Sequence, residues 1–235
     1  MFSLDFAILA NMIEIQGHRG SMGTHKENTL CAFQEAIEAG CVGIELDLRL
    51  TKEKEIIIHH DSSIKKIPID SLTISEIKKI DEDLITLQEL FSFAEKKIEY
   101  NLEMKWHSSL DPTEFVKKVV DLVEKNELKK KVAYSSFNEK VLFAVQKIDK
   151  SAKIGYLNDK SLKELESRGF ALHAAVLSPH HTLLTKKEDV EKLQKKGARV
   201  IPWTVDEIDR LQELVNMGVD GVITNYPRKC IEYLK

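Results

Sequence analysis

The sequence predicts an α/β protein whose strands close into a TIM (β/α)8 barrel, and three observations support this fold class. Short apolar runs alternate with amphipathic stretches along the chain, as expected of parallel strands that are each followed by a helix. The length of 235 residues is normal for one such barrel. Polar residues suited to chemistry follow several apolar runs, where the loops of a barrel meet. We therefore expect one domain over residues 1–235, with a small insertion at 61–86 after the second strand region.

Eight short apolar runs have the length and composition of strands. In chain order they cover residues 13–17, 42–50, 98–104, 131–135, 152–156, 171–177, 199–203 and 221–224. Eight amphipathic stretches alternate with them, and in the first of these Phe33, Ala36 and Ile37 have helical spacing. The predicted helices cover residues 29–39, 87–95, 112–125, 138–148, 160–168, 186–196, 206–217 and 227–234.

Several predicted helix boundaries carry capping signals. Asp111 stands before Pro112, which suits the first turn of a helix, and Asn138 is a favoured residue at a helix start. Glycines at 40, 197 and 218 follow predicted helix ends, where a left-handed backbone is common. Residues 61–83 break the rhythm with Pro68 and lysine-rich turns. We assign them to an excursion on the loop side of the barrel.

Composition excludes some classes of protein. Apolar residues make up 43% of the chain and charged residues 31%, which indicates a globular protein with enough apolar material for a large core. The net charge is −3, and the lysines are dispersed rather than gathered in the basic stripe that nucleic-acid binding requires. We therefore expect no nucleic-acid partner, and a small molecule as the ligand.

Cysteine usage and the first residues indicate a cytoplasmic protein. Cys31, Cys41 and Cys230 are odd in number and unclustered, which favours a reducing compartment over a disulfide framework. Residues 1–10 are mildly apolar but lack a basic region and are too short to span a bilayer. We expect no targeting segment and no stable membrane insertion. Residues 1–11 fit an extension, an added helix or a misassigned start, and the oligomeric state stays open.

Three carboxylates have the arrangement of a metal site. Glu45 and Asp47 are two apart in an apolar strand, so their side chains project from the same face. Glu103 ends the next predicted barrel strand, where Lys105 shares its face. Oxygen ligands without cysteine favour Mg²⁺ or Ca²⁺ over zinc. The alternative for each carboxylate alone is a solvated or salt-bridged group, but three at one end of a barrel favour a metal site.

Two histidines are the acid–base candidates. An imidazole exchanges protons near neutral pH, and His18 and His60 both follow strand-like runs that lead to the predicted site. His59 precedes His60, so strand alternation turns it away from the pocket. Structural hydrogen bonding is the alternative role for a lone histidine after a strand. The remaining candidates are expected to be structural or on the surface: His107, His173, His180 and His181.

Cationic and aromatic residues accompany these groups. Arg19 and Lys105 would neutralise a phosphate group, although ion pairing with the same carboxylates is the alternative. Trp203 follows the apolar run of the seventh strand and is equally compatible with a substrate-facing wall and with a core aromatic. The combination indicates metal-assisted cleavage of a phosphodiester.

The chain resembles the glycerophosphodiester phosphodiesterase family. The matching segments are HRG (18–20), ENTLCAFQEAIEAG (27–40), GIELDLRLTKE (43–53), HD (60–61), NLEMK (101–105), SSF (135–137), PWTVDE (202–207) and GVDGVITNYP (218–227). The resemblance implies a TIM barrel that hydrolyses glycerophosphodiesters to sn-glycerol 3-phosphate and an alcohol with Mg²⁺ or Ca²⁺. Carried over by motif, it implies the following roles: His18 and His60 as the acid–base pair, Glu45, Asp47 and Glu103 as metal ligands, and Arg19 and Lys105 at the phosphate.

Three positions depart from the family pattern. Lys26 replaces the usual proline before Glu-Asn-Thr, and Asn225 replaces the usual aspartate before Tyr-Pro. The excursion after Asp61 is short and lacks the arginine and the glycine-rich turn that are common in the family. None of these changes removes a predicted catalytic group.

Two other functions remain as alternatives. A lysophospholipase D or a phospholipase C-like enzyme would use the same residues on lipid-bearing phosphodiesters. A non-catalytic phosphodiester-binding module would need no pair of histidines. The sequence does not identify the leaving alcohol, the metal, the nucleophile, or which histidine is the acid.

Overall fold

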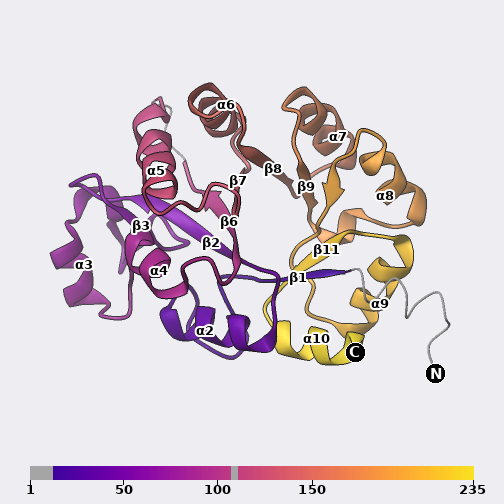
Figure 1. The fold of residues 1–235 in the computed structure, drawn as a ribbon, viewed down its shortest axis with the longest axis horizontal. Helices are drawn as coiled ribbons and strands as arrows, with labels where there is room; N and C mark the ends of the chain where they lie inside the picture. The colour runs from indigo at the N-terminus through magenta and orange to yellow at the C-terminus, as the bar shows by residue number, and fades with distance from the viewer. Residues whose placement is uncertain (1–12, 107–110) are drawn as a thin grey trace.

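The computed structural model describes residues 13–106 and 111–235, which form a nearly closed barrel of parallel strands inside a ring of helices (Figure 1). The barrel strands follow the spatial order β10-β9-β8-β7-β6-β2-β1-β11. Their bounds are β1 Glu14–Gly17, β2 Gly43–Leu50, β6 Glu99–Met104, β7 Val132–Ser136, β8 Lys153–Asn158, β9 Val176–Pro179, β10 Arg199–Val200 and β11 Gly221–Thr224. The predicted TIM barrel is confirmed.

The barrel closes between β10 and β11 without a regular ladder. β10 was predicted to run to Trp203 but ends at Val200. Pro202 has no N–H to donate, which interrupts the ladder on the side of β11, while on the side of β9 the Ile201 and Trp203 amides still donate to the Leu177 and Pro179 carbonyls at 3.1 Å. Backbone hydrogen bonds still join the two segments, from the Asp220 amide to the Val200 carbonyl at 2.9 Å and from the Ile223 amide to the Pro202 carbonyl at 3.0 Å. These bonds hold Trp203 at the carboxyl end of the barrel.

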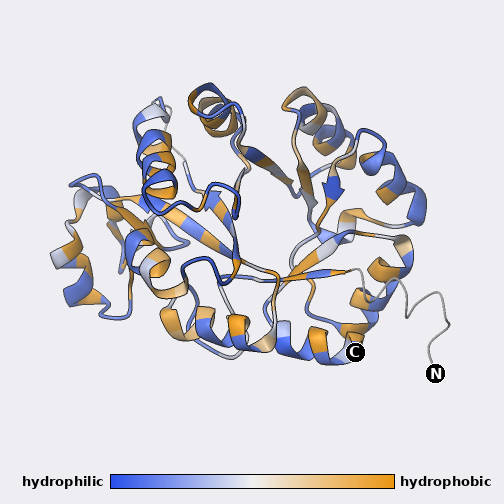
Figure 2. Ribbon diagram, viewed as in Figure 1, coloured by the Kyte–Doolittle hydropathy of each residue, from blue (hydrophilic) through white to orange (hydrophobic). Residues whose placement is uncertain are grey.

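The helices cover the outside of the barrel with their apolar faces inward. Their bounds are α2 Leu30–Ala39, α4 Leu87–Ala94, α5 Thr113–Lys125, α6 Glu139–Ile148, α7 Leu162–Ala171, α8 Lys187–Gln194, α9 Ile208–Met217 and α10 Pro227–Leu234. Figure 2 shows hydrophobic and hydrophilic residues on different sides of these helices. The side chain of Asn138 accepts a hydrogen bond from the Lys140 amide at 3.0 Å, so the predicted cap of α6 is present.

The sixth strand, which is predicted from residue 171, begins later in the structure. Ala171 is the last residue of α7 rather than the first of a strand, and β9 begins at Val176. Gly169 lies in the last turn of α7, where an added Cβ would come within 2.2 Å of a Leu177 side-chain carbon. Close packing of helix against strand therefore explains the longer helix, because Gly169 permits it where a larger residue would not.

The predicted insertion contains its own small elements. These are β4 (Ser63–Ile64), β5 (Ile67–Pro68), the 3₁₀ helix η1 (Ile69–Ser71) and α3 (Ile74–Ile80), and they follow β3 (Ile56–Ile58), which lies before the insertion and pairs antiparallel with β2. With Ile57 of β3, the buried side chains of the insertion form a cluster apart from the main core: Ile64, Ile69, Leu72, Ile77 and Leu84. The helix α3 was not predicted, and in the structure it begins with a capping box of Thr73 and Glu76.

Some predictions fall outside this description. Residues 1–11 and His107 lie outside the described ranges, and the prediction of one domain over 1–235 stays a prediction. A second 3₁₀ helix, η2 (His181–Leu183), follows β9. None of the helices within 13–106 and 111–235 combines the length and hydropathy needed to cross a membrane.

Candidate active site

Three buried carboxylates meet at the carboxyl ends of β2 and β6. These strands are parallel neighbours, and their register pairs Asp47 with Glu103 and Glu45 with Asn101. Each carboxylate offers an oxygen within 4.8 Å of the others. The exposed fractions are only 2% for Glu45, 1% for Asp47 and 7% for Glu103. The structure therefore brings together the three predicted metal ligands.

Burial and mutual repulsion change the pKa values of this cluster. Burial, followed by the charges of Asp47 and Glu103, raises the pKa of Glu45 well above its usual range. Burial likewise raises the pKa of Glu103, although Lys105 opposes the shift. Burial alone would raise the pKa of Asp47, but Lys105 and Arg19 outweigh it and the pKa is lowered. Among the three carboxylates, Asp47 is the one whose surroundings lower its pKa.

The donor atoms of the cluster fit a hard divalent cation. Glu45 Oε1 and Asp47 Oδ1 are buried and receive no hydrogen bond from the described residues. A buried carboxylate oxygen without a donor is unfavourable unless a positive ion satisfies it. Oxygen-only ligands are the preference of Mg²⁺ and Ca²⁺. The acidic cluster could therefore hold such an ion.

Two cations lie against the carboxylates. Lys105 Nζ is 2.6 Å from Glu103 Oε1 and 3.2 Å from Asp47 Oδ1, and Arg19 Nε is 3.2 Å from Asp47 Oδ2. The two contacts to Asp47 are within ion-pair distance but lack hydrogen-bond geometry, since Arg19 Nε and Asp47 Oδ1 have no hydrogen-bond partner. Burial would lower the pKa of Lys105, but Glu103 and Asp47 raise it above its usual value. Both cations stay charged, with unused capacity for an anion.

The loop between β1 and α2 holds Arg19 in place. Arg19 and Asn28 both have left-handed backbone, with φ of 49° and 57°. The Arg19 amide donates to Glu45 Oε2 at 3.1 Å, and its guanidinium donates to Glu27 Oε2 at 2.7 Å. Asn28 Nδ2 donates to Asp47 Oδ2 at 2.9 Å. The loop therefore contacts two of the three carboxylates directly.

His18 is fixed by residues from the last βα units of the barrel. Its Nδ1 lies 2.6 Å from Asn225 Oδ1, and its Nε2 lies 3.8 Å from Glu45 Oε2. Asn225 is held in turn by Asp206, which accepts from the Asn225 amide at 2.8 Å and from Nδ2 at 2.6 Å. Burial, and then the charge of Arg19, lower the pKa of His18. His18 is therefore disposed to be neutral near neutral pH.

His60 lies at a more open position. Its backbone carbonyl accepts hydrogen bonds from Arg49 Nε at 2.9 Å and from Arg49 Nη2, while its Nδ1 is 2.9 Å from Asp61 Oδ1. Its side chain is 36% exposed, against 15% for His18. His59 interacts with the backbone of Ser63 and does not line the cavity beside the carboxylates. The structure thus brings His60, not His59, to the site.

A cavity of about 130 Å³ connects the two histidines to the carboxylates. Its lining residues are His18, Arg19, Glu45, His60, Glu103, Lys105, Phe137, Leu157, Trp203 and Ile223. Trp203 forms part of the wall, with its ring edge-on to Phe137 at 5.4 Å and to His180 at 5.2 Å between centroids. Its Nε1 donates to the Ser178 carbonyl at 2.9 Å. Seven of the eight predicted site residues line this cavity, and Asp47 lies directly behind them.

A wider groove of about 1040 Å³ adjoins the cavity and shares four of its lining residues: His60, Glu103, Lys105 and Phe137. It extends across the start of α6 toward α7. Phe137 and Phe143 are 38% and 51% exposed there. The groove therefore offers an aromatic surface on the His60 side of the site.

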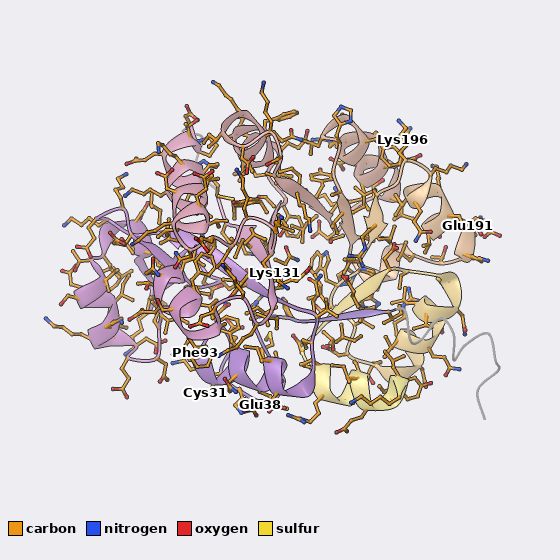
Figure 3. All side chains as sticks on the ribbon, in the orientation of Figure 1. Cys31, Glu38, Phe93, Lys131, Glu191 and Lys196 are labelled. Atoms are coloured by element: carbon orange, nitrogen blue, oxygen red, sulfur yellow. The ribbon has the colours of Figure 1, made fainter. Side chains whose placement is uncertain are left out.

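Within residues 13–106 and 111–235, the other surface features lack this concentration of buried charge. Figure 3 labels Cys31, Glu38 and Phe93, which line a shallow hollow over α2 and α4 on the outside of the barrel. His180 and His181 lie at the end of β9 and in η2 but do not line the cavity. Their predicted structural or surface roles agree with these positions.

Sequence reasoning assigned no role to several residues that complete the site: Asn28, Arg49, Phe137, Asp206 and Asn225. All five fall within the matching motifs. Their position in those motifs was the available signal, but their contacts depend on how distant strands meet. Arg49 shares the face of Glu45 and Asp47 along β2, so strand alternation could have included it.

A parallel barrel with acidic, basic and imidazole groups at the carboxyl ends of its strands has the layout of a TIM-barrel enzyme. Residues 18–229 match the glycerophosphoryl diester phosphodiesterase family. A glycerophosphodiester phosphodiesterase of Caldanaerobacter subterraneus subsp. tengcongensis is 32% identical, over 93% of this chain and 96% of its own length. The chain therefore belongs to this family, as its motifs predicted, and it is a phosphoric diester hydrolase that acts on glycerophosphodiesters.

Solved structures agree with this membership. The glycerophosphodiester phosphodiesterase of Thermotoga maritima is 29% identical, with a TM-score of 0.81 over 94% of this chain and 97% of its own. A phosphodiesterase of Oleispira antarctica, solved with its product sn-glycerol 3-phosphate, is 23% identical. It has the same fold, with a TM-score of 0.85 over 97% of this chain and 98% of its own.

Proposed function

We propose that this enzyme hydrolyses glycerophosphodiesters to sn-glycerol 3-phosphate and an alcohol, with a divalent cation and a pair of histidines. The observation that carries the proposal is the cavity in which His18 and His60 face the carboxylates and both cations. Phosphodiester cleavage needs a base for the nucleophile, an acid for the leaving alcohol and positive charge at the phosphate. Residues suited to all three tasks line one small cavity, which supports the proposal.

Glu45, Asp47 and Glu103 are the proposed ligands of the cation, which is Mg²⁺ or Ca²⁺. When bound, the cation supplies Lewis-acid stabilisation of the negative charge that develops at the phosphate. Arg19 and Lys105 bind the phosphate oxygens, because both cations lie at the wall of the cavity with donors available. Trp203 forms the wall against which the organic part of the substrate packs.

The positions of the two histidines favour different roles. His18 is buried and carries a lowered pKa, so we assign it as the base that accepts a proton from the attacking oxygen of water or of the glycerol hydroxyl. His60 lies where the cavity joins the groove, so we assign it as the acid that protonates the departing alkoxide. The P–O bond to the alcohol breaks as the new P–O bond forms, and the alcohol leaves through the groove.

Release of glycerol 3-phosphate, coupled to a dehydrogenase readout, tests this function. The substrates are glycerophosphocholine, glycerophosphoethanolamine and glycerophosphoglycerol, first with EDTA and then with Mg²⁺ or Ca²⁺ restored. We expect turnover that depends on the cation, and a loss in kcat of at least about 100-fold in His18→Ala and in His60→Ala. Circular dichroism and unfolding midpoints close to wild type would show that both variants fold. Near-normal turnover by either variant would defeat its assignment.

One observation favours a second candidate, a lysophospholipase D that acts on lipid-bearing phosphodiesters. The exposed Phe137 and Phe143 give the groove an apolar surface that a small alcohol such as choline would not cover. Hydrolysis of lysophospholipids, compared with hydrolysis of the deacylated diesters under the same conditions, separates the two candidates. Preference for the deacylated diesters would reject the lysophospholipase D function.

A further inference from the structure

The amide of Asn225 stands between the ring of His18 and the carboxylate of Asp206. These contacts join segments far apart in the sequence, since His18 and Asn225 are separated by 207 positions. β1 and β11 are neighbours in the barrel and pair Gly17 with Thr224, which places the residues that follow them side by side. The contact is therefore a product of barrel closure.

The orientation of the Asn225 amide follows from Asp206. Asp206 Oδ1 accepts from the Asn225 backbone amide at 2.8 Å and from the Thr224 hydroxyl at 3.2 Å, and Oδ2 lies 2.6 Å from Asn225 Nδ2. A carboxylate only accepts hydrogen bonds, so the side of Asn225 that faces it must be the NH₂ group. The carbonyl oxygen of Asn225 then faces His18.

The orientation of the Asn225 amide determines which nitrogen of the His18 imidazole carries a proton. Asn225 Oδ1 lies 2.6 Å from His18 Nδ1, and a carbonyl oxygen only accepts, so Nδ1 must carry the proton. A neutral imidazole has one N–H, and Nε2 is then left with its lone pair. Nε2 is the nitrogen that lies 3.8 Å from Glu45 Oε2, on the side of the carboxylate cluster.

We propose that Asn225 and Asp206 are positioning residues that hold neutral His18 as the Nδ1–H tautomer, with the lone pair of Nε2 directed into the cavity. This inference rests on the proposed function for its catalytic meaning, because a base must present a free nitrogen to the reacting atoms. Asp206 sets the amide orientation, Asn225 transmits it, and neither residue lines the cavity. The other tautomer would place an N–H on the nitrogen that must accept a proton.

The direct test is the tautomer itself, read by long-range ¹H–¹⁵N correlation spectra of the full chain labelled with ¹⁵N-histidine. Spectra are recorded at about pH 8, with EDTA and with Mg²⁺, and the His18 signals are assigned by their absence in His18→Gln. We expect the Nδ1–H pattern in wild type under both conditions. An Nε2–H pattern in wild type would overturn the inference without any variant.

Variants test the relay. In Asn225→Ala and in Asp206→Asn we expect the His18 signals to move toward the Nε2–H form, and kcat to fall at least about 10-fold while KM changes by less than about twofold. The double variant should lose no more than Asn225→Ala alone, because both residues act through one chain of hydrogen bonds. Asp206→Glu, which keeps the carboxylate, should retain the Nδ1–H form. The matched control is Asp209→Asn, an exposed acid on α9, which should change neither the spectra nor the kinetics.

The outcomes separate this inference from the proposed function. An unchanged His18 tautomer in Asn225→Ala would overturn the positioning role, whatever the kinetics. An Nδ1–H tautomer in a protein that turns over no glycerophosphodiester would reject the proposed function while the hydrogen-bond relay stands.

Discussion

At the amino ends of the barrel strands, partly exposed charged groups are matched by hydrogen bonds, whereas at the carboxyl ends several buried polar atoms have no hydrogen-bond partner among the described residues. Arg199 Nη1 donates to Glu14 Oε1 at 2.9 Å, and Nη2 donates to the Asp220 carbonyl at 3.2 Å. Asp220 Oδ2 in turn accepts from the Val200 amide at 2.7 Å and from Gln194 Nε2 at 2.8 Å. Six buried side-chain polar atoms of the described residues lack a hydrogen-bond partner, and four belong to the candidate site: Arg19 Nε, Asn28 Oδ1, Glu45 Oε1 and Asp47 Oδ1.

The contrast extends along a single strand. Asn101 and Glu103 project from the same face of β6, and Asn101 accepts from Ser135 Oγ at 2.7 Å and donates to Gln16 Oε1 at 3.3 Å. Two residues further on, Glu103 faces Asp47 and its pKa is raised by burial. Among the described residues, charged atoms without a hydrogen-bond partner are therefore concentrated in the layer where substrate and cation would bind, and Asp149 Oδ2 is the exception outside it. Unmatched buried charge at such a site lowers the stability of the folded protein, but it leaves the charged groups already placed for binding.

The largest expected effect comes from removing charge at the carboxyl end. In Glu45→Gln we expect activity to fall at least about 100-fold, since one proposed ligand loses its charge. The metal-free protein should become more stable by about 1 kcal/mol, because repulsion from Asp47 and Glu103 is relieved. Turnover assays and urea unfolding in EDTA measure the two changes.

A control for this prediction lies at the other end of the neighbouring strand. Glu99 begins β6 and is not part of the acidic cluster. Glu99→Gln should leave turnover unchanged and should not stabilise the protein. If Glu45→Gln instead destabilises the metal-free protein, the contrast between the two ends of the barrel is wrong.

The second prediction concerns the pH dependence of this stability difference. A carboxyl group whose pKa is higher in the folded state than in the unfolded state binds a proton more tightly when the protein is folded. Its favourable contribution to the free energy of unfolding is therefore lost as the pH rises. For Glu45 this loss runs from about pH 4.3, the ordinary value for glutamate, up through its raised native pKa. The lowered pKa of Asp47 acts with the opposite sign, but at pH values below about 3.9.

Wild type and Glu45→Gln are therefore compared by urea unfolding in EDTA at about pH 5 and about pH 8. We expect the stability advantage of the variant to widen with pH by at least about 1 kcal/mol, the equivalent of less than one pKa unit. Histidines distant from Glu45 contribute equally to both proteins and cancel in the difference, whereas His18, with Nε2 3.8 Å from Glu45 Oε2, does not. An advantage that stays constant across this range would show that Glu45 ionises in the folded protein as it does in the unfolded chain.

The sequence was sufficient to predict the parts of the site that depend on local geometry. Strand alternation is enough to predict that Glu45 and Asp47 share a face, and that Glu103 and Lys105 do so on β6. The barrel rule then predicts that both pairs meet at the same end. Strand alternation is also enough to choose His60 over His59, because it continues through β3 to the histidines that follow this strand.

The sequence was insufficient where contacts depend on packing or on barrel closure. The contact of His18 with Asn225 requires the first and last strands to pair, and no local pattern encodes its distance. The late start of β9 reflects helix packing at Gly169, which strand propensity does not register. Arg49 reaches the His60 carbonyl because β3 folds back antiparallel onto β2, a pairing that the simple βα rhythm does not contain.

The third prediction removes a matched charge at the amino end. Arg199→Ala should lower the free energy of unfolding by about 1 kcal/mol, because two hydrogen bonds to Glu14 and Asp220 are lost on a half-exposed surface. The kinetic constants should remain those of wild type. Arg228→Ala, which removes an exposed pair with Glu35 on the outer helices, is the control and should cost less. A fall in kcat in Arg199→Ala would mean that the two ends are coupled.

The smallest effect is expected at an exposed ion pair beside the site. Lys26 stands where the family usually has proline, and its Nζ lies 2.5 Å from Asp81 and 3.0 Å from Asp83, which joins the loop carrying Glu27 and Asn28 to the insertion. Lys26→Ala should cost less than about 0.5 kcal/mol, since exposed pairs contribute little and salt screens them. KM should rise by less than about twofold at low ionic strength and return to the wild-type value in about 0.5 M salt. Lys79→Ala, which removes a lysine from α3 but not this pair, should change neither quantity. A larger rise in KM that persists in high salt would show that Lys26 holds the loop by packing rather than by charge.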